Sequence, residues 1–167
     1  MARPSINELT SVQDPLQTWN WSLNIPNIPG SNLARDITIK CQSANLPGSS
    51  VEQVAVEAHG VKLNFAGRRQ WSGTWEATFF ESRSATTRTA FVNWLELQRS
   101  WANNSGSYKE QYSVTAEISQ YDDLPKEVKN VRLRGFFPMT IADVSLDQTS
   151  GVVIYSVTFS YDYAEDV

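Results

Sequence analysis

Few side chains of this sequence could act together in catalysis. His59 is the single histidine and stands beside Gly60 at a predicted turn, so it cannot pair with a second histidine on a metal. Cys41, the single cysteine, continues the apolar alternation of Ile37 and Ile39, which favours a buried structural thiol over a reactive one. One cysteine also excludes a disulfide framework and fits synthesis in a reducing compartment. We expect no enzymatic activity, no metal and no cofactor.

The charged clusters indicate ordinary structural roles. Residues 143–149 place side-chain oxygens at alternate positions, as a calcium loop does, but the central glycine is missing and Ile154 stands where a bidentate glutamate belongs. Asp122 and Asp123 precede Leu-Pro-Lys and are typical of a solvated turn. The pair Arg68-Arg69 is too small for a nucleic-acid patch and suits an ion pair, including one with a neighbouring copy.

Length and composition narrow the class of protein. The 167 residues suit one domain, which we place at 16–167 after an N-terminal arm of residues 1–15 that contains two prolines. Apolar residues make up 41% of the chain, no apolar run is long enough to span a membrane, and the N-terminus lacks the apolar core of a secretory signal. Lys and Arg number 14 against 18 Asp and Glu, and this net charge of −4 argues against a protein that grips nucleic acid.

The elements that must position these residues are mainly strands, because apolar and polar residues alternate along most of the chain. A Pro47-Gly48 loop interrupts this alternation after residue 44, and Gly135 to Pro138 bend the chain. The predicted strands are 16–25, 37–41, 51–58 and 61–65 around a His59-Gly60 turn, 74–81, 112–119, 128–134, 140–146 and 152–163.

Only residues 84–101 show helical periodicity. Ala90, Trp94, Leu97 and Trp101 recur at steps of four, three and four, and Phe91 and Leu95 widen the same stripe. Ser84, Thr86 or Thr87 can cap the start of the helix. A helix this aromatic on one side needs a sheet to pack on.

Three strands carry one face of small polar and acidic side chains without Lys or Arg. These faces are Thr74, Glu76 and Thr78; Ser113, Thr115, Glu117 and Ser119; and Ser156, Thr158, Ser160 and Asp162. One interpretation is an ordinary solvated sheet. The other is the lining of a water-filled passage over which a polyanion slides without sticking. The sequence pattern leaves both open.

Four stretches, taken in order, resemble the tail tube proteins of contractile-tailed bacteriophages. They are Cys41 to Val54 with its Leu-Pro loop, Val61 to Arg69 with Ala-Gly before a charged turn, the Phe91-Val-Asn-Trp-Leu helix, and Arg134 to Asp147 followed by Val157 to Tyr163. The resemblance covers nearly the whole chain from Trp19 onward, and the arm 1–15 differs most.

This resemblance implies a mainly β fold, a two-sheet β-barrel or sandwich with one flanking helix, assembled as hexameric rings stacked into a tube. The suspected lumen-facing residues are then Glu76, Thr78, Thr115, Glu117, Ser156, Thr158 and Asp162, with no cation adjacent to the acids. The suspected ring-stacking loop comprises Leu46, Pro47, Gly48, Val51 and Glu52, and the helix packs on the barrel through Phe91, Trp94, Leu95, Leu97 and Trp101.

The resemblance also implies partners and a location. The partners are further copies of the chain, a contractile sheath protein, and baseplate and tail terminator proteins, and genomic DNA transits the lumen without specific binding. The tube is assembled in the host bacterial cytoplasm and becomes part of the virion tail. Two alternatives remain: a tube protein of a tailocin, type VI or extracellular contractile injection system, and a monomeric β-barrel that binds a ligand through exposed Trp residues.

Overall fold

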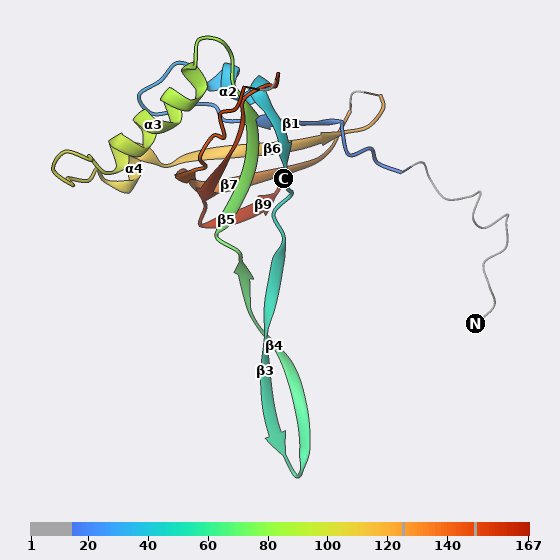
Figure 1. Cartoon of the computed structure of the whole chain (residues 1–167). Coiled ribbons are helices and arrows are strands. Elements are labelled where there is room, and N and C mark those ends of the chain that lie inside the picture. Colours follow the sequence, from blue (N-terminus) through green and yellow to red (C-terminus); the bar gives the residue numbers. More distant parts are fainter. Residues whose placement is uncertain (1–14, 125, 149) are drawn as a thin grey trace.

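One bent sheet encloses the hydrophobic core (Figure 1). The computed structural model describes residues 15–124, 126–148 and 150–167. The sheet contains seven strands in the order β1-β6-β7-β8-β5-β2, and β9 pairs with β7. The strands are β1 (Trp21–Asn24), β2 (Cys41–Ala44), β5 (Thr74–Phe80), β6 (Val114–Tyr121), β7 (Glu127–Ile141), β8 (Ile154–Ser160) and β9 (Tyr163–Asp166). A separate hairpin of β3 (Ser49–Ala58) and β4 (Val61–Trp71) projects from this body.

The long strand β7 divides the sheet into two halves. Up to Phe136 it pairs with β6 and β9, and from Phe137 it pairs with β8. We call β1, β6, β9 and the first part of β7 the β6 half, and β2, β5, β8 and the end of β7 the β5 half. Gly135, at φ +65°, lies at the junction, and an added Cβ there would overlap the Asp162 carboxylate. The bend predicted at Gly135 is therefore real, although β7 is continuous where two strands had been predicted.

Both halves bury their apolar face against the same core. Ala116, Ile118 and Leu133 come from the β6 half, and Trp75, Phe79 and Phe159 come from the β5 half. Phe136 links the two halves, since its ring stacks on Phe159 with centroids 4.4 Å apart. The predicted mainly β fold is confirmed. The predicted two-sheet barrel is instead one bent sheet, and this sheet is not closed among the described residues, because β1 and β2 end the strand order without pairing with each other.

The predicted helix forms as α3 (Thr86–Gln98). Phe91 and Trp94 are fully buried, Leu95 is half-buried, and Leu97 lies at the edge of the contact. The inclusion of Trp101 in this packing was wrong: it follows the helix and is 87% exposed. The capping prediction was also wrong. Ala85 precedes the helix without a side-chain cap, and the Glu81 carboxylate instead accepts hydrogen bonds from the backbone N–H groups of Ser82, Thr87 and Arg88 at 3.0, 3.3 and 2.8 Å.

Several predicted strands have different boundaries. Residues 37–41 were predicted as a strand, but Ala34–Lys40 form the helix α2, which buries Ile37 and exposes Ile39. The first strand is limited to β1, and Trp19 is exposed before it. The segment 152–163 divides into β8 and β9, Tyr112 ends the short helix α4 (Lys109–Tyr112), and residues 142–148 are not a strand. Among the described residues, no helix is long and apolar enough to cross a membrane.

Candidate assembly surface

The β3–β4 hairpin is a two-faced ribbon that stands away from the core. His59 and Gly60, at φ 50° and 78°, form the predicted turn, whose positive dihedrals match the twist of a tight hairpin. Register pairs Val54 with Phe65, Val56 with Leu63 and Ala58 with Val61, so these side chains share one face. The opposite face carries Glu57 against Lys62 and Ala55 against Asn64. All residues from Ser49 to Gln70 are exposed, so the apolar face is uncovered in the single chain.

The predicted stacking loop connects the sheet to this hairpin. Leu46, Pro47 and Gly48 lie between β2 and β3, whereas Val51 and Glu52 belong to β3 beside a register shift. Glu52 also packs against Gly67, where an added Cβ would lie 3.0 Å from the Glu52 carbonyl oxygen. We also expect the arm 1–15 to make contacts between stacked rings, because it has too little apolar surface to order itself; it lies outside the described residues except for Pro15.

On the β5 half, the predicted polar side chains lie together. Glu76 is directly opposite Thr158, and Thr78 is opposite Ser156. Thr78 also hydrogen-bonds to Ser43 of β2, and Thr140 of β7 lies opposite Thr158. The strand segments of this half, 41–44, 74–80, 137–141 and 154–160, contain neither Lys nor Arg. Their outward surface is therefore small in side chain and carries Glu76 as its charged residue.

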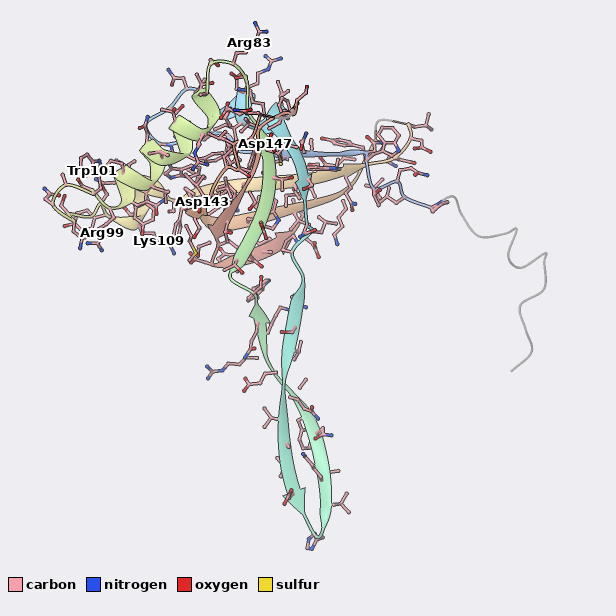
Figure 2. All side chains as sticks on the ribbon, in the orientation of Figure 1. Arg83, Arg99, Trp101, Lys109, Asp143 and Asp147 are labelled. Carbon is pink, nitrogen blue, oxygen red and sulfur yellow. The ribbon has the colours of Figure 1, made fainter. Side chains whose placement is uncertain are left out.

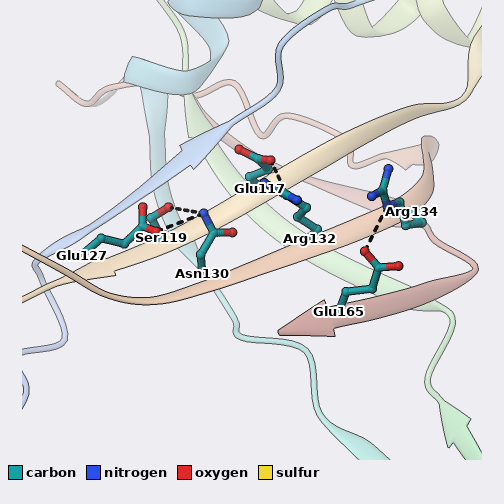
Figure 3. A network of polar contacts seen from close by, with 7 residues as sticks. All are labelled: Glu117, Ser119, Glu127, Asn130, Arg132, Arg134 and Glu165. Carbon is teal, nitrogen blue, oxygen red and sulfur yellow. Dashed lines mark hydrogen bonds and ion pairs between the residues drawn. The ribbon is translucent and has the colours of Figure 1, made fainter. Parts of the chain in front are cut away.

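On the β6 half, the predicted acid is ion-paired, and the expectation that it has no adjacent cation was wrong. Figure 3 shows Glu117 of β6 accepting a 2.6 Å bond from Arg132 of β7, and Glu165 of β9 bound to Arg134 at 3.2 Å. Asn130 donates to Ser119 and to Glu127 in the same surface, both at 3.3 Å. Glu117 and Arg132 are direct cross-strand partners, so the sheet register itself brings the charges together.

Asp162 is also paired. It lies in the turn between β8 and β9, and its two carboxylate oxygens accept hydrogen bonds from Lys109 of α4 at 2.6 Å. Its backbone N–H donates to the Arg134 carbonyl at 2.8 Å, and its carboxylate rests on Gly135. This contact holds the turn before β9 against α4 and the bend in β7.

The predicted lumen residues therefore fall into two sets. Glu76, Thr78, Ser156 and Thr158 point outward from the β5 half, and Thr115 and Glu117 point outward from the β6 half. Because both halves turn their apolar side to one core, the two outward faces lie on opposite sides of it. One passage cannot be lined by both.

Sequence reasoning missed the cations Lys109, Arg132 and Arg134 as partners of these acids. A signal was present, since residues 114–121 and 127–134 are joined by a short turn, and pairing them antiparallel sets Glu117 against Arg132. The alternation of apolar residues in 54–58 and 61–65 also gave no sign that these side chains are exposed and do not pack into the core. Cys41 was predicted as a buried structural thiol; it is half-buried at the start of β2, and desolvation raises the pKa of its thiol to about 12, which favours the unreactive protonated form.

Comparisons with known proteins agree with this architecture. The family model described as phage tail tube protein matches residues 11–165. This chain belongs to the phage tail tube protein family. It is 27% identical to the tail tube protein gp19 of Enterobacteria phage T4 over 146 residues, which cover 85% of this chain and 89% of that protein. The corresponding protein of Enterobacteria phage T6 is 28% identical over the same length. The role of this family member is structural.

Solved structures share the fold at low sequence identity. A chain of the PVC sheath-tube complex, an extracellular contractile injection system, superimposes with a TM-score of 0.67 at 14% identity over 99% of both chains. A chain of the anti-feeding prophage baseplate gives 0.67 at 15% identity over 93% of this tail tube protein and 97% of that chain. This tail tube protein therefore shares its fold with these chains of contractile injection systems.

Proposed function

We propose that this protein forms the inner tube of a contractile phage tail, as rings of six copies stacked end to end, and that phage DNA passes through its lumen into the host. Its partners are further copies of the chain, the contractile sheath, the baseplate and the tail terminator. The tube is assembled in the host bacterial cytoplasm and is carried in the virion tail. Membership of the tail tube family and the likeness to T4 and T6 gp19 support this role.

The observation that carries the proposal is the uncovered apolar face of the hairpin. Val54, Val56, Val61, Leu63 and Phe65 are each about half exposed and line up on one side of the ribbon. None of these five belongs to the core cluster, which the hairpin meets at its base through Trp71. A lone hairpin of this kind is marginally stable in water. We infer that a second copy of the chain covers the apolar face of the hairpin, and in stacked rings a copy in the next ring is available to do so.

Free sheet edges support lateral association within a ring. β1 and β2 each pair on one side only, and β9 pairs only with β7 among the described strands. Unpaired edges expose rows of N–H and C=O groups that another copy can satisfy. We propose that neighbouring subunits meet through these edges.

We propose that the β5 half lines the lumen. Four strands from this half in each of six copies, at about 4.8 Å spacing, give a backbone circle of roughly 37 Å, or about 50 Å when the strands are tilted by ~40–45°. That leaves room for a DNA duplex after side chains are added. The absence of Lys and Arg from these four strand segments suits transit, because cations would hold each phosphate by releasing its counterions.

The second candidate is the tube of an injection system that carries protein cargo or none. The superposition with extracellular injection-system chains favours it, although at 14–15% identity that likeness concerns the fold alone. The two candidates differ in cargo. Nuclease treatment of native particles, before and after the tube is opened, distinguishes a DNA-bearing tube from one without DNA.

Assembly of the purified chain tests the proposal. Negative-stain images should show six-fold rings or tubes, and sedimentation at high concentration should show species much larger than 18.8 kDa. Because nucleation can limit assembly, the same experiment is repeated with baseplate added. A chain that is monomeric in the native particle refutes the proposal.

A further inference from the structure

A groove at the end of the molecule opposite the hairpin has the chemistry to receive it. The groove has a volume of about 1010 Å³ and lies between the start of α3 and the segment that leads into β8. Val144, Leu146, Val152 and Val153 form its apolar wall, and the charged side chains that line it are Glu81, Arg83, Arg88 and Asp143. Leu146 is 83% exposed and Val152 is 66% exposed, so this wall is uncovered in the single chain.

The floor of the groove is held rigidly. Tyr155 is buried there and donates a 3.3 Å hydrogen bond to Glu81, the carboxylate that caps α3. Arg88 lies 5.4 Å from the centre of the Tyr155 ring and donates to the Ala142 carbonyl at 2.9 Å. These contacts link the start of α3 to Ala142 and Tyr155, so both sides of the groove are joined at its floor.

Charges on the hairpin and the groove are complementary. Glu57 and Lys62 oppose each other near the hairpin tip, and neither has an ion-pair partner among the described residues. In the same described part of the chain, Arg83 and Asp143 of the groove have no ion-pair partner either. The hairpin thus offers an apolar face beside one acid and one base, and the groove offers an apolar wall beside Asp143 with Arg83 on the α3 side.

The positions of the two surfaces decide how they can meet. The hairpin extends from one end of the body, whereas Arg83 and the segment around Asp147 lie at the other end (Figures 1 and 2). Ten residues of β3 at about 3.3 Å each give the hairpin a reach of roughly 33 Å. A contact between opposite ends of identical chains is heterologous, so it does not close between two copies and propagates along an axis.

We propose that the groove formed by Arg83, Asp143, Val144, Leu146, Val152 and Val153 receives the tip of the β3–β4 hairpin from a copy in the next ring. The apolar face of the tip packs on the valine and leucine wall, and Glu57 and Lys62 meet Arg83 and Asp143. The inference rests on the proposed stacking of rings and adds the surface that accepts each hairpin.

Cysteine cross-linking in assembled tubes tests this contact. In a Cys41→Ala background, subunits with Val61→Cys or Leu63→Cys in the hairpin are co-assembled with mass-tagged subunits carrying Val152→Cys, and mild oxidant is added. Val128→Cys, an exposed apolar position in β7, replaces the hairpin cysteine as the matched control. Thermal unfolding of each variant verifies that the subunits are folded before mixing.

The expected result is a covalent dimer of tagged and untagged subunits in tubes, at least tenfold above the Val128→Cys control and absent from unassembled chains. Tubes that form normally while both hairpin cysteines give no more dimer than the control overturn the groove assignment and leave the tube function standing. A chain without cysteine substitutions that never forms rings or tubes, with or without baseplate, overturns the proposed function and the groove assignment together.

Discussion

Replacing Phe65 with serine removes the largest apolar side chain of the hairpin face and should weaken tube assembly without unfolding the subunit. Full burial of a Phe or Leu side chain contributes about 1.5–3 kcal/mol. Phe65 is 54% exposed in the single chain, so assembly can recover roughly half of this, about 0.8–1.6 kcal/mol per subunit. Since 1.4 kcal/mol is tenfold in an equilibrium constant, the critical concentration for assembly should rise about 4- to 15-fold.

A second substitution raises the effect and sharpens the test. Leu63 lies on the same face and is 47% exposed, so Leu63→Ser combined with Phe65→Ser should raise the critical concentration by roughly 10- to 150-fold. The assay is a pelleting titration in which soluble and tube-bound protein are measured after ultracentrifugation. Asn64→Ser, between these residues on the opposite face, is the matched control and should change the critical concentration less than twofold.

We also expect an unchanged melting temperature for the unassembled variants, because Leu63 and Phe65 lie outside the core cluster, which the hairpin meets through Trp71 at its base. If the double variant assembles at the concentration of the unsubstituted chain, the apolar face is not buried in the tube. If its unassembled subunit melts much earlier, the hairpin supports the fold in a way that its exposure does not explain.

Three further predictions concern the cap, the bend and the proposed lumen. Burial alone would raise the pKa of Glu81, but the hydrogen bonds from the backbone N–H groups of Arg88, Ser82 and Thr87 outweigh burial and lower this pKa. The ionised Glu81 therefore stabilises the fold above about pH 4.3, and this stabilisation is lost as the pH falls through the lowered pKa. Glu81→Gln should cost about 1–2 kcal/mol at pH 7 and flatten the acid limb of a stability titration; an unchanged acid limb contradicts the capping role. Gly135→Ala should lower the free energy of unfolding, measured in denaturant, by about 1–3 kcal/mol, because the added Cβ displaces Asp162 from Lys109. Gly151→Ala is the control and should be near neutral, because Gly151 has open space around it. Equal effects of the two substitutions would exclude the close approach of Asp162 as the cause. Glu76→Lys should leave tubes intact and slow DNA ejection at low salt, since each lysine–phosphate contact strengthens by about eightfold for a tenfold drop in salt; normal ejection at low salt would remove Glu76 from the path of the DNA.

The strand pattern was readable where a strand has one buried and one solvated face. In β5 and β8 the alternation of Trp75, Ala77 and Phe79 with Glu76 and Thr78 matches the observed burial residue by residue. The tight hairpin turn at His59-Gly60 was also readable, because few residues other than glycine adopt its positive φ.

Alternation of apolar residues predicted the wrong element in a short segment where the strand period of two and the helix period of about four fit the same residues. Ile37, Ile39 and Cys41 alternate as in a strand, but Ile37 and Cys41 are also four apart, as on one face of a helix, and Ala34–Lys40 form α2. Seven residues are too few for periodicity to decide between the two. Only the packing of Ile37 into the core fixes the helix.

The candidate site was predictable in its residues but not in its arrangement. The polar faces were identified from alternation, yet which faces share a side depends on the bend of β7 at Gly135 and on the order of the strands, and these are tertiary properties. The ion pairs of Glu117 with Arg132 and of Asp162 with Lys109 likewise depend on register and on the placement of α4. Alternation within one strand carries no information about either.

A three-dimensional reconstruction of tubes assembled from the purified protein would show whether this chain forms the wall of a tube. We expect six copies per ring, the outward face of the β5 half with Glu76 and Thr158 lining the lumen, and each β3–β4 hairpin buried against the next ring. Tubes with another symmetry, a lumen lined by the Glu117–Arg132 face, or hairpins left free in solvent would contradict it.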